Sequence, residues 1–428
     1  MANRVIEISI LFLIIFTPLF KGTLSGWAVW AVHFVSFILL ILWIMKIKDE
    51  RNSKFKKTPL FYPIMIFFFL AILSVFFSFD RKKSILEFIK LCDYIIIFYI
   101  VVHTINSTKQ IRQILYTMVG IGFFISILGL LQYVGGMGHA WWISNKELSA
   151  TFENSNYYAA YMNLIIPMAI ALLLYDDLEL GKRIMLIYCL GIMIVAYIYS
   201  LCRGGWISLS IALVIMLIVM MAKYFIGHFE KVKPRLWVLI LVLPIIIYFS
   251  KMIGASPFIN SLNPANFYAR LTIWKEASNI VKAYPLVGAG IGVFNNFNDA
   301  IPEKLKNRDN NGFIERLQKL ALSSYQGYDG LNFDNEYFQV GTEMGIPALV
   351  IIAWIVLRLF YESGLLLFKK NNHLKQIVSL GFLGGGIASI ILMLSANVLR
   401  FMSNTILLTI LAGLIFVSDR QYKRQSYK

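Results

Sequence analysis

The sequence has 428 residues, of which 58% are hydrophobic and only 15% are charged, and its mean hydropathy is +0.69. Soluble domains carry roughly 25% charged residues, so the composition excludes a soluble protein and predicts a polytopic membrane protein. The net charge of +17 does not indicate a nucleic-acid partner, because 22 of the 40 Lys and Arg residues fall in alternate short segments between apolar runs, as topology signals do.

The apolar runs predict an all-α membrane protein with about twelve transmembrane helices, since each span needs about 17 to 25 mostly apolar residues. Arg4 precedes the first run and no small-residue cleavage site follows it, so we expect an uncleaved first span rather than a signal peptide. The expected spans are residues 5–20, 24–45, 59–78, 86–104, 111–134, 157–174, 184–202, 205–222, 236–250, 343–361, 376–395 and 399–417.

Basic residues cluster in alternate connections and near both ends of the chain, which places those connections and both termini in the cytoplasm. The short segment 80–83, with the sequence DRKK, disagrees with this pattern, but the other connections alternate consistently and decide the orientation. The longest polar stretch, residues 251–342, is then extracytoplasmic. The expected parts are nine spans in 1–250, a mostly helical loop domain in 251–342, and three spans with a basic tail in 343–428.

Charged residues in the fourth expected span need partners. Glu87, Lys90 and Asp93 lie three residues apart, so Lys90 can reach either carboxylate from the same helix face. Structural pairing is one interpretation of this group, and a pathway for protons or substrate is the other. The three cysteines show no CxxC spacing, so neither a disulfide framework nor a zinc site is expected.

Arg203, in the sequence SLCRGGW, lies between two apolar runs at the outer boundary of the membrane. A cation at a helix N-terminus opposes the helix dipole, and a positive charge on the outer side opposes the topology signal. This placement favours an anion-binding residue, and an interfacial anchor is the alternative.

The large loop contains an amphipathic helix in which Arg270 and Trp274 share one face, followed by Pro285 and a Gly-x-Gly-x-Gly turn that includes Gly288 and Gly290. Without a preceding strand the glycines are weak evidence for a phosphate-binding loop. A simple turn is an equal alternative.

These elements, in this order, resemble the bacterial O-antigen ligase and O-antigen polymerase superfamily. The resemblance consists of a serine and arginine-glycine element at Ser200 and Arg203, the Arg-x3-Trp helix with its glycine turn, and a polar pair before a span at Asp334 and Asn335. Residues 149–167 also resemble a threonine-phenylalanine-x-asparagine stretch of the family, and the likeness extends over about 149–361.

The resemblance implies a metal-independent, inverting glycosyltransferase of the bacterial cytoplasmic membrane that needs no cofactor. Its donor would be an undecaprenyl-diphosphate-linked oligosaccharide, and its acceptor a glycan, a lipid or a glycoprotein. Arg203 and Arg270 would hold the diphosphate, because a guanidinium stays charged and binds phosphate oxygens in pairs. Trp274, Asn335, Gly288 and Gly290 would support the site.

The family places histidine where this sequence has Asp334, and the large loop contains no histidine. A carboxylate whose pKa is raised by burial can still accept a hydroxyl proton, so Asp334 is the candidate base, with Glu336 and Glu343 as rivals. The alternative is that Asp334 and Asn335 only cap the next helix. Arg400, at the outer end of a later span, is either a further phosphate contact or an anchor.

A flippase or transporter of lipid-linked glycan is the competing function. Twelve spans with buried charges suit a transporter, but the chain shows no internal repeat in matched halves, which many transporters have. A purely structural membrane protein leaves Arg203 unexplained.

Overall fold

The computed structural model describes residues 2–20, 25–49, 57–135, 147–152, 154–225, 264–294, 333–369 and 373–426, and these residues form helices and no strands. The all-α prediction is confirmed for this part of the chain. The twelve helices within these ranges are α1 (Ala2–Leu19), α2 (Gly26–Asp49), α3 (Phe61–Phe76), α4 (Arg81–Thr104), α5 (Thr108–Gly135), α6 (Ser155–Tyr175), α7 (Leu180–Tyr199), α8 (Arg203–Phe225), α10 (Pro264–Ala283), α13 (Glu336–Leu367), α14 (His373–Leu392) and α15 (Met402–Ser426).

Eight of the helices in the described residues, among them α2, α6 and α13, are long and apolar enough to cross a membrane, and α3 is a shorter apolar helix. The predicted ninth span, 236–250, lies outside the described residues, so the number twelve stays a prediction. The predicted tenth span, 343–361, begins close to the apolar half of α13, whereas the helix as a whole begins at Glu336. The first turns of α13 are polar, so the hydropathy pattern places them in the loop.

Helix α6 lies at the centre of the bundle, and every one of its residues except Asn156 is buried. Helix α14 packs closely against it. A Cβ atom on Gly385 would lie 3.1 Å from the Leu164 Cα, and one on Gly384 would lie 2.7 Å from the Pro167 Cβ. Small residues allow this close approach between membrane helices, where packing replaces the hydrophobic effect.

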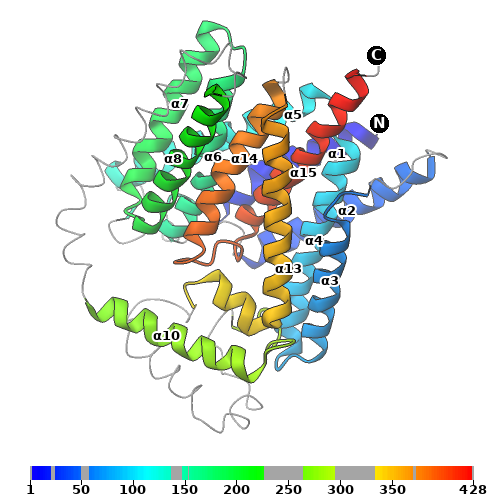
Figure 1. The fold of residues 1–428 in the computed structure, drawn as a ribbon, viewed down its shortest axis with the longest axis vertical. Coiled ribbons are helices and arrows are strands. Elements are labelled where there is room, and N and C mark those ends of the chain that lie inside the picture. Colours follow the sequence, from blue (N-terminus) through cyan, green and yellow to red (C-terminus); the bar gives the residue numbers. More distant parts are fainter. Residues whose placement is uncertain are drawn as a thin grey trace.

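Both termini lie at the end of the bundle opposite α10 (Figure 1). The turn between α3 and α4 lies at the α10 end, because the Phe79 N–H donates to the Ala289 carbonyl over 3.1 Å. The exceptional DRKK segment therefore lies on the same side as the glycine turn, as the alternation of spans requires. Asp80 caps α4 there by accepting a hydrogen bond from the Lys83 N–H.

Helix α13 is broken at Gly345, whose φ of 82° and ψ of 177° are not helical. The break separates an N-terminal half-helix, residues 336–344, from the long apolar half that follows Pro347. The glycine turn, residues 285–292, supplies hydrogen-bond partners for backbone groups of α13 near the break. The N–H groups of Ala289 and Gly290 donate to the carbonyls of Thr342 and Glu343, and the Ile346 N–H donates to the Pro285 carbonyl.

Ser74 of α3 completes this arrangement, since its hydroxyl donates to the Glu343 carbonyl at 2.8 Å and accepts from the Ile291 N–H at 2.9 Å. Backbone polar groups at membrane depth must be satisfied within the protein. The glycine turn, α3 and the broken helix therefore form one hydrogen-bonded unit.

Gly288→Ala is expected to destabilise the protein strongly. Gly288 has a φ of 68°, and an added Cβ would lie 2.2 Å from the Glu343 carbonyl carbon. The left-handed backbone alone costs about 1–2 kcal/mol for an L-residue, and the overlap adds to it. Thermal unfolding in detergent measures the effect. Gly364→Ala is the matched control, because its added Cβ would meet nothing within 4 Å apart from its chain neighbours and the backbone of its own helix. Equal stability of the two variants would contradict the assignment.

Candidate functional site

The start of α13 organises the site, and its cap is Asn335. The Asn335 side-chain oxygen accepts hydrogen bonds from the N–H groups of Tyr337 and Phe338, and its amide donates to the Leu394 carbonyl at 3.1 Å. The capping alternative therefore describes Asn335, whose side chain is used by the backbone. Asp334 lies one residue earlier and is not the cap.

Asp334 faces α10, where one oxygen of its carboxylate lies 3.5 Å from an Arg270 guanidinium nitrogen. About a third of each side chain is exposed, so a ligand can reach this pair. Burial raises the pKa of the Asp334 carboxyl above its ordinary value, while the charges of Arg270 and Arg400 oppose the rise. The backbone of Asp334 has a φ of 47°, a conformation that is uncommon outside glycine.

Trp274 fixes the position of Arg270. Its indole N–H donates to the Phe333 carbonyl at 2.9 Å, and its ring stacks on Phe338. Arg270 and Trp274 lie one helical turn apart, as predicted, so the same face of α10 contacts the residues on either side of Asp334. The apolar face of α10 packs against Phe333 as well, through Ile273, Ala277 and Ile280.

Arg203 reaches the same region from the first residue of α8, where it is half-buried. Burial raises the pKa of the neighbouring Cys202 thiol to about 12, and the charges of Arg203 and Arg270 both act against that rise. Both guanidinium groups therefore lie within electrostatic range of one atom. The structure brings together Arg270 and Asp334, which are far apart in the sequence, and Arg203 acts on the same thiol as Arg270.

Gly288 and Gly290 do not offer free N–H groups to a ligand. The Gly288 N–H donates to the Tyr284 carbonyl, and the Gly290 N–H donates to the Glu343 carbonyl. The turn alternative, rather than the phosphate-binding loop, describes these glycines. Their support for the site is indirect, through the break in α13.

Glu336 and Arg400 lie beside Asp334 but face a cavity of about 350 Å³ among α3, α4, α13, α14 and α15. One Glu336 carboxylate oxygen accepts the Leu399 N–H at 3.0 Å, which ties the half-helix to the turn between α14 and α15. The charge of Arg400 acts on the carboxylates of both Asp334 and Glu336. Arg400 is thus close to the site, and its role as a contact or an anchor is still a prediction.

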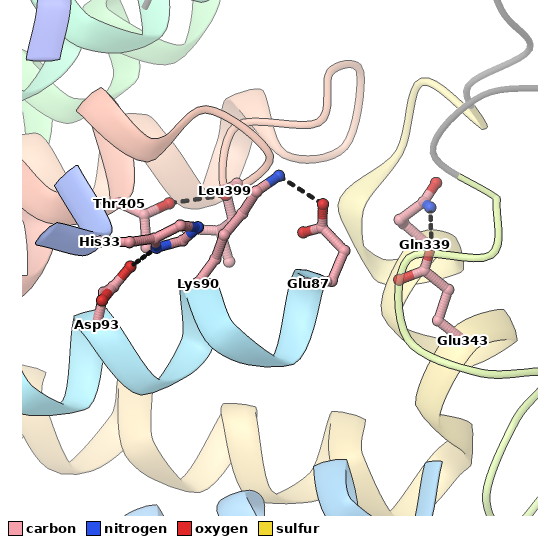
Figure 2. Close-up of polar contacts among 8 residues, drawn as sticks. All are labelled: His33, Glu87, Lys90, Asp93, Gln339, Glu343, Leu399 and Thr405. Carbon is pink, nitrogen blue, oxygen red and sulfur yellow. Dashed lines mark hydrogen bonds and ion pairs between the residues drawn. The ribbon is translucent and has the colours of Figure 1, made fainter. Parts of the chain in front are cut away.

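Two polar residues of α4, Glu87 and Lys90, line the same cavity, and Figure 2 shows them on one helix with Asp93. Lys90 pairs with Glu87 at 2.5 Å, whereas Asp93 contacts His33 of α2 at the same distance. The prediction that Lys90 reaches a carboxylate on its own helix is confirmed for Glu87. The sequence analysis did not predict the contact between His33 and Asp93. The available signal was that His33 is a lone histidine in an apolar run, while Asp93 lies in another span and needs a partner.

Glu343 lies further along the half-helix and accepts a hydrogen bond from the Gln339 amide. It is buried against the glycine turn and also lines the cavity. In the described residues, no group of three or more His, Cys, Asp or Glu side chains is arranged to hold a metal ion.

The apolar spans, the broken polar half-helix and the converging arginines define a multi-pass helical membrane protein with a charged site at one end of the bundle. Residues 188–353 match the family model described as O-antigen ligase. The protein is therefore a membrane protein with an O-antigen ligase domain, and this family implies a glycosyltransferase-like enzyme. The match includes Arg203, α10, the glycine turn and Asp334, whereas residues 149–167 lie outside it. No curated protein matches the chain.

Asn335→Ala is expected to lower the free energy of unfolding by about 1 kcal/mol, the usual cost of losing an N-cap side chain. Asp334→Asn should leave stability nearly unchanged, since Asp334 caps nothing and Asn tolerates its left-handed backbone. Chemical or thermal unfolding in detergent compares the two. Equal losses of unfolding free energy in the two variants would indicate that Asp334 also caps the helix.

Proposed function

We propose that the protein transfers or polymerises an undecaprenyl-diphosphate-linked glycan on the outer face of the bacterial cytoplasmic membrane, with both termini in the cytoplasm. The observation that carries the proposal is the ion pair between Arg270 and Asp334, together with an Arg203 whose charge acts on the same Cys202 thiol as that of Arg270. Two permanent cations and one carboxylate at a membrane boundary suit a reaction in which a diphosphate leaves and a hydroxyl loses its proton.

Arg203 and Arg270 hold the diphosphate of the donor in this proposal. Charge develops on the phosphate oxygens as the glycosidic bond breaks, and fixed guanidinium groups stabilise that charge without reorganisation. The same two charges replace the divalent metal that many nucleotide-sugar transferases use, so the reaction is metal-independent and unaffected by chelators.

Asp334 acts as the general base. When the diphosphate engages Arg270, the Asp334 carboxylate loses its partner and is free to accept the proton of the acceptor hydroxyl. The hydroxyl oxygen then forms a bond to the anomeric carbon, the bond from that carbon to the phosphate oxygen breaks, and the electron pair leaves with the diphosphate. Attack from the side opposite the leaving group inverts the anomeric configuration.

Arg203→Ala and Arg270→Ala are each expected to lower glycan transfer at least about 100-fold, as the loss of one transition-state donor typically does. The assay uses purified protein in liposomes with a lipid-linked glycan donor. Lys275→Ala is the matched control on the exposed face of α10 and should retain activity. Full activity in either arginine variant would remove the diphosphate clamp.

Asp334→Asn should abolish transfer, whereas Asp334→His should restore part of it, because histidine can accept a proton and also tolerates this backbone conformation. Both variants are assayed at saturating donor. If Asn and His support the same rate, Asp334 is not the base, and Glu336 and Glu343 become the next carboxylates to test.

Activity is expected to fall as the pH drops through the raised pKa of Asp334, since only the carboxylate accepts a proton. Arg400 opposes the rise of this pKa, so Arg400→Gln should move the acidic limb of the pH–rate profile to higher pH. Arg358→Gln, far along the apolar half of α13, is the control and should leave the profile unchanged. An unshifted profile in Arg400→Gln would mean that Asp334 does not set this limb.

The same liposomes separate transfer from transport. Movement of labelled lipid-linked glycan across the bilayer, without a new glycosidic bond, would favour the flippase alternative over the transferase. Formation of the bond in liposomes that show no such movement supports the transferase.

A further inference from the structure

The cavity beside the site is apolar over most of its lining and polar at one end. Phe67 of α3, Phe98 of α4, Ile355 of α13 and Leu408 of α15 represent its apolar part. Its polar end is formed by Glu87, Lys90, Glu336, Gln339, Glu343 and Arg400.

The cavity extends along the helix axes. On α4 its lining runs from Glu87 to Phe98, which is about 16 Å at the rise of an α-helix. Apolar residues of α3, α13 and α15 face this length. An elongated apolar space parallel to membrane helices suits a hydrocarbon chain, with the polar group of the same molecule at the Glu87 end.

The charges at the polar end select against a diphosphate. Three carboxylates, from Glu87, Glu336 and Glu343, line this end together with two cations, Lys90 and Arg400. Lys90 is already paired with Glu87, and the charges of Glu87 and Glu336 both act on Glu343. The two cations at this end are shared among three acidic side chains, which makes them poorer partners for a diphosphate than unshared guanidinium groups.

A neutral, hydroxyl-bearing headgroup fits this end better. Carboxylate oxygens accept hydrogen bonds from hydroxyl groups, and the Gln339 amide can donate or accept. Glu336 is two residues from Asp334, and Arg400 acts on both carboxylates. A sugar bound at this end would therefore lie next to the candidate base.

We propose that the cavity binds the hydrocarbon chain of the acceptor, a glycolipid whose uncharged sugar headgroup contacts Glu336, Gln339 and Glu343. This inference rests on the proposed function for the word acceptor. It assigns the acceptor to the membrane lipids rather than to soluble sugars or proteins, and it gives donor and acceptor separate places. The donor diphosphate lies at Arg203 and Arg270, and the acceptor lies on the cavity side of Asp334.

Photoaffinity labelling tests the cavity without any need for catalysis. Two probes carry a diazirine in the hydrocarbon chain: an alkyl glucoside, which is neutral, and a polyprenyl diphosphate. The protein is reconstituted in liposomes, irradiated and digested, and labelled peptides are identified by mass spectrometry. The glucoside is expected to label the lining segments of α4, α13 and α15, and an excess of unlabelled polyprenyl diphosphate should not compete.

Ile355→Trp and Leu408→Trp narrow the cavity from two different helices and should each lower glucoside labelling about tenfold. Leu357→Trp makes a similar change on α13 at a side chain that is 69% exposed, and it should label like the unaltered protein. Glu343→Gln removes one carboxylate at nearly constant size and should also weaken glucoside labelling. Unchanged labelling in both tryptophan variants would overturn the proposal.

Labelling of the same peptides by the diphosphate probe, with mutual competition, would also overturn it, because the cavity would then hold the donor. Arg203→Ala should label normally with the glucoside. Normal labelling together with full transfer activity in Arg203→Ala would count against the diphosphate clamp alone. Lost labelling in Ile355→Trp and Leu408→Trp, with unchanged labelling in Leu357→Trp, supports the cavity alone.

Discussion

The break in α13 at Gly345 is the constraint on which the rest of the site depends. A helix interrupted at membrane depth exposes carbonyl and N–H groups that lipid cannot satisfy. Here the segment from Pro285 to Ile291 supplies three hydrogen-bond partners at the break, and the Ser74 hydroxyl supplies a further one. Because the break is closed in this way, the half-helix of residues 336–344 can stand apart from the long apolar half and present its polar side chains to the cavity.

The same connection explains why the site residues come together. Helix α10 leads directly into the glycine turn, so once the turn is fixed against α13, Arg270 and Trp274 are also fixed near residues 333–334. The Trp274 hydrogen bond and the Asn335 cap then hold the two ends of this short stretch. Asp334, between them, is held by its neighbours in a left-handed conformation that it does not favour alone.

The sequence was sufficient for the helical class and for most of the apolar helices, because apolar run length is a local property. The roles of Arg203, Arg270 and Asp334 stay predictions, although Arg270 and Asp334 do form an ion pair. The sequence was not sufficient for the start of α13. Glu336, Gln339 and Glu343 make that segment too polar for a hydropathy pattern, and only tertiary contacts with α10 and the α14–α15 turn make it helical. The partner of Asp93 also depended on packing between α2 and α4, which periodicity along one helix does not describe.

The serine at position 74 has a consequence for how the chain is assembled. Its partner carbonyl at Glu343 is 269 residues away in the sequence, and its partner N–H at Ile291 is 217 residues away. The hairpin of α3 and α4 is therefore inserted long before the segments that bind it are synthesised. Membrane insertion of the first eight helices cannot by itself complete the site, which forms only when the last third of the chain returns to a surface laid down near the beginning.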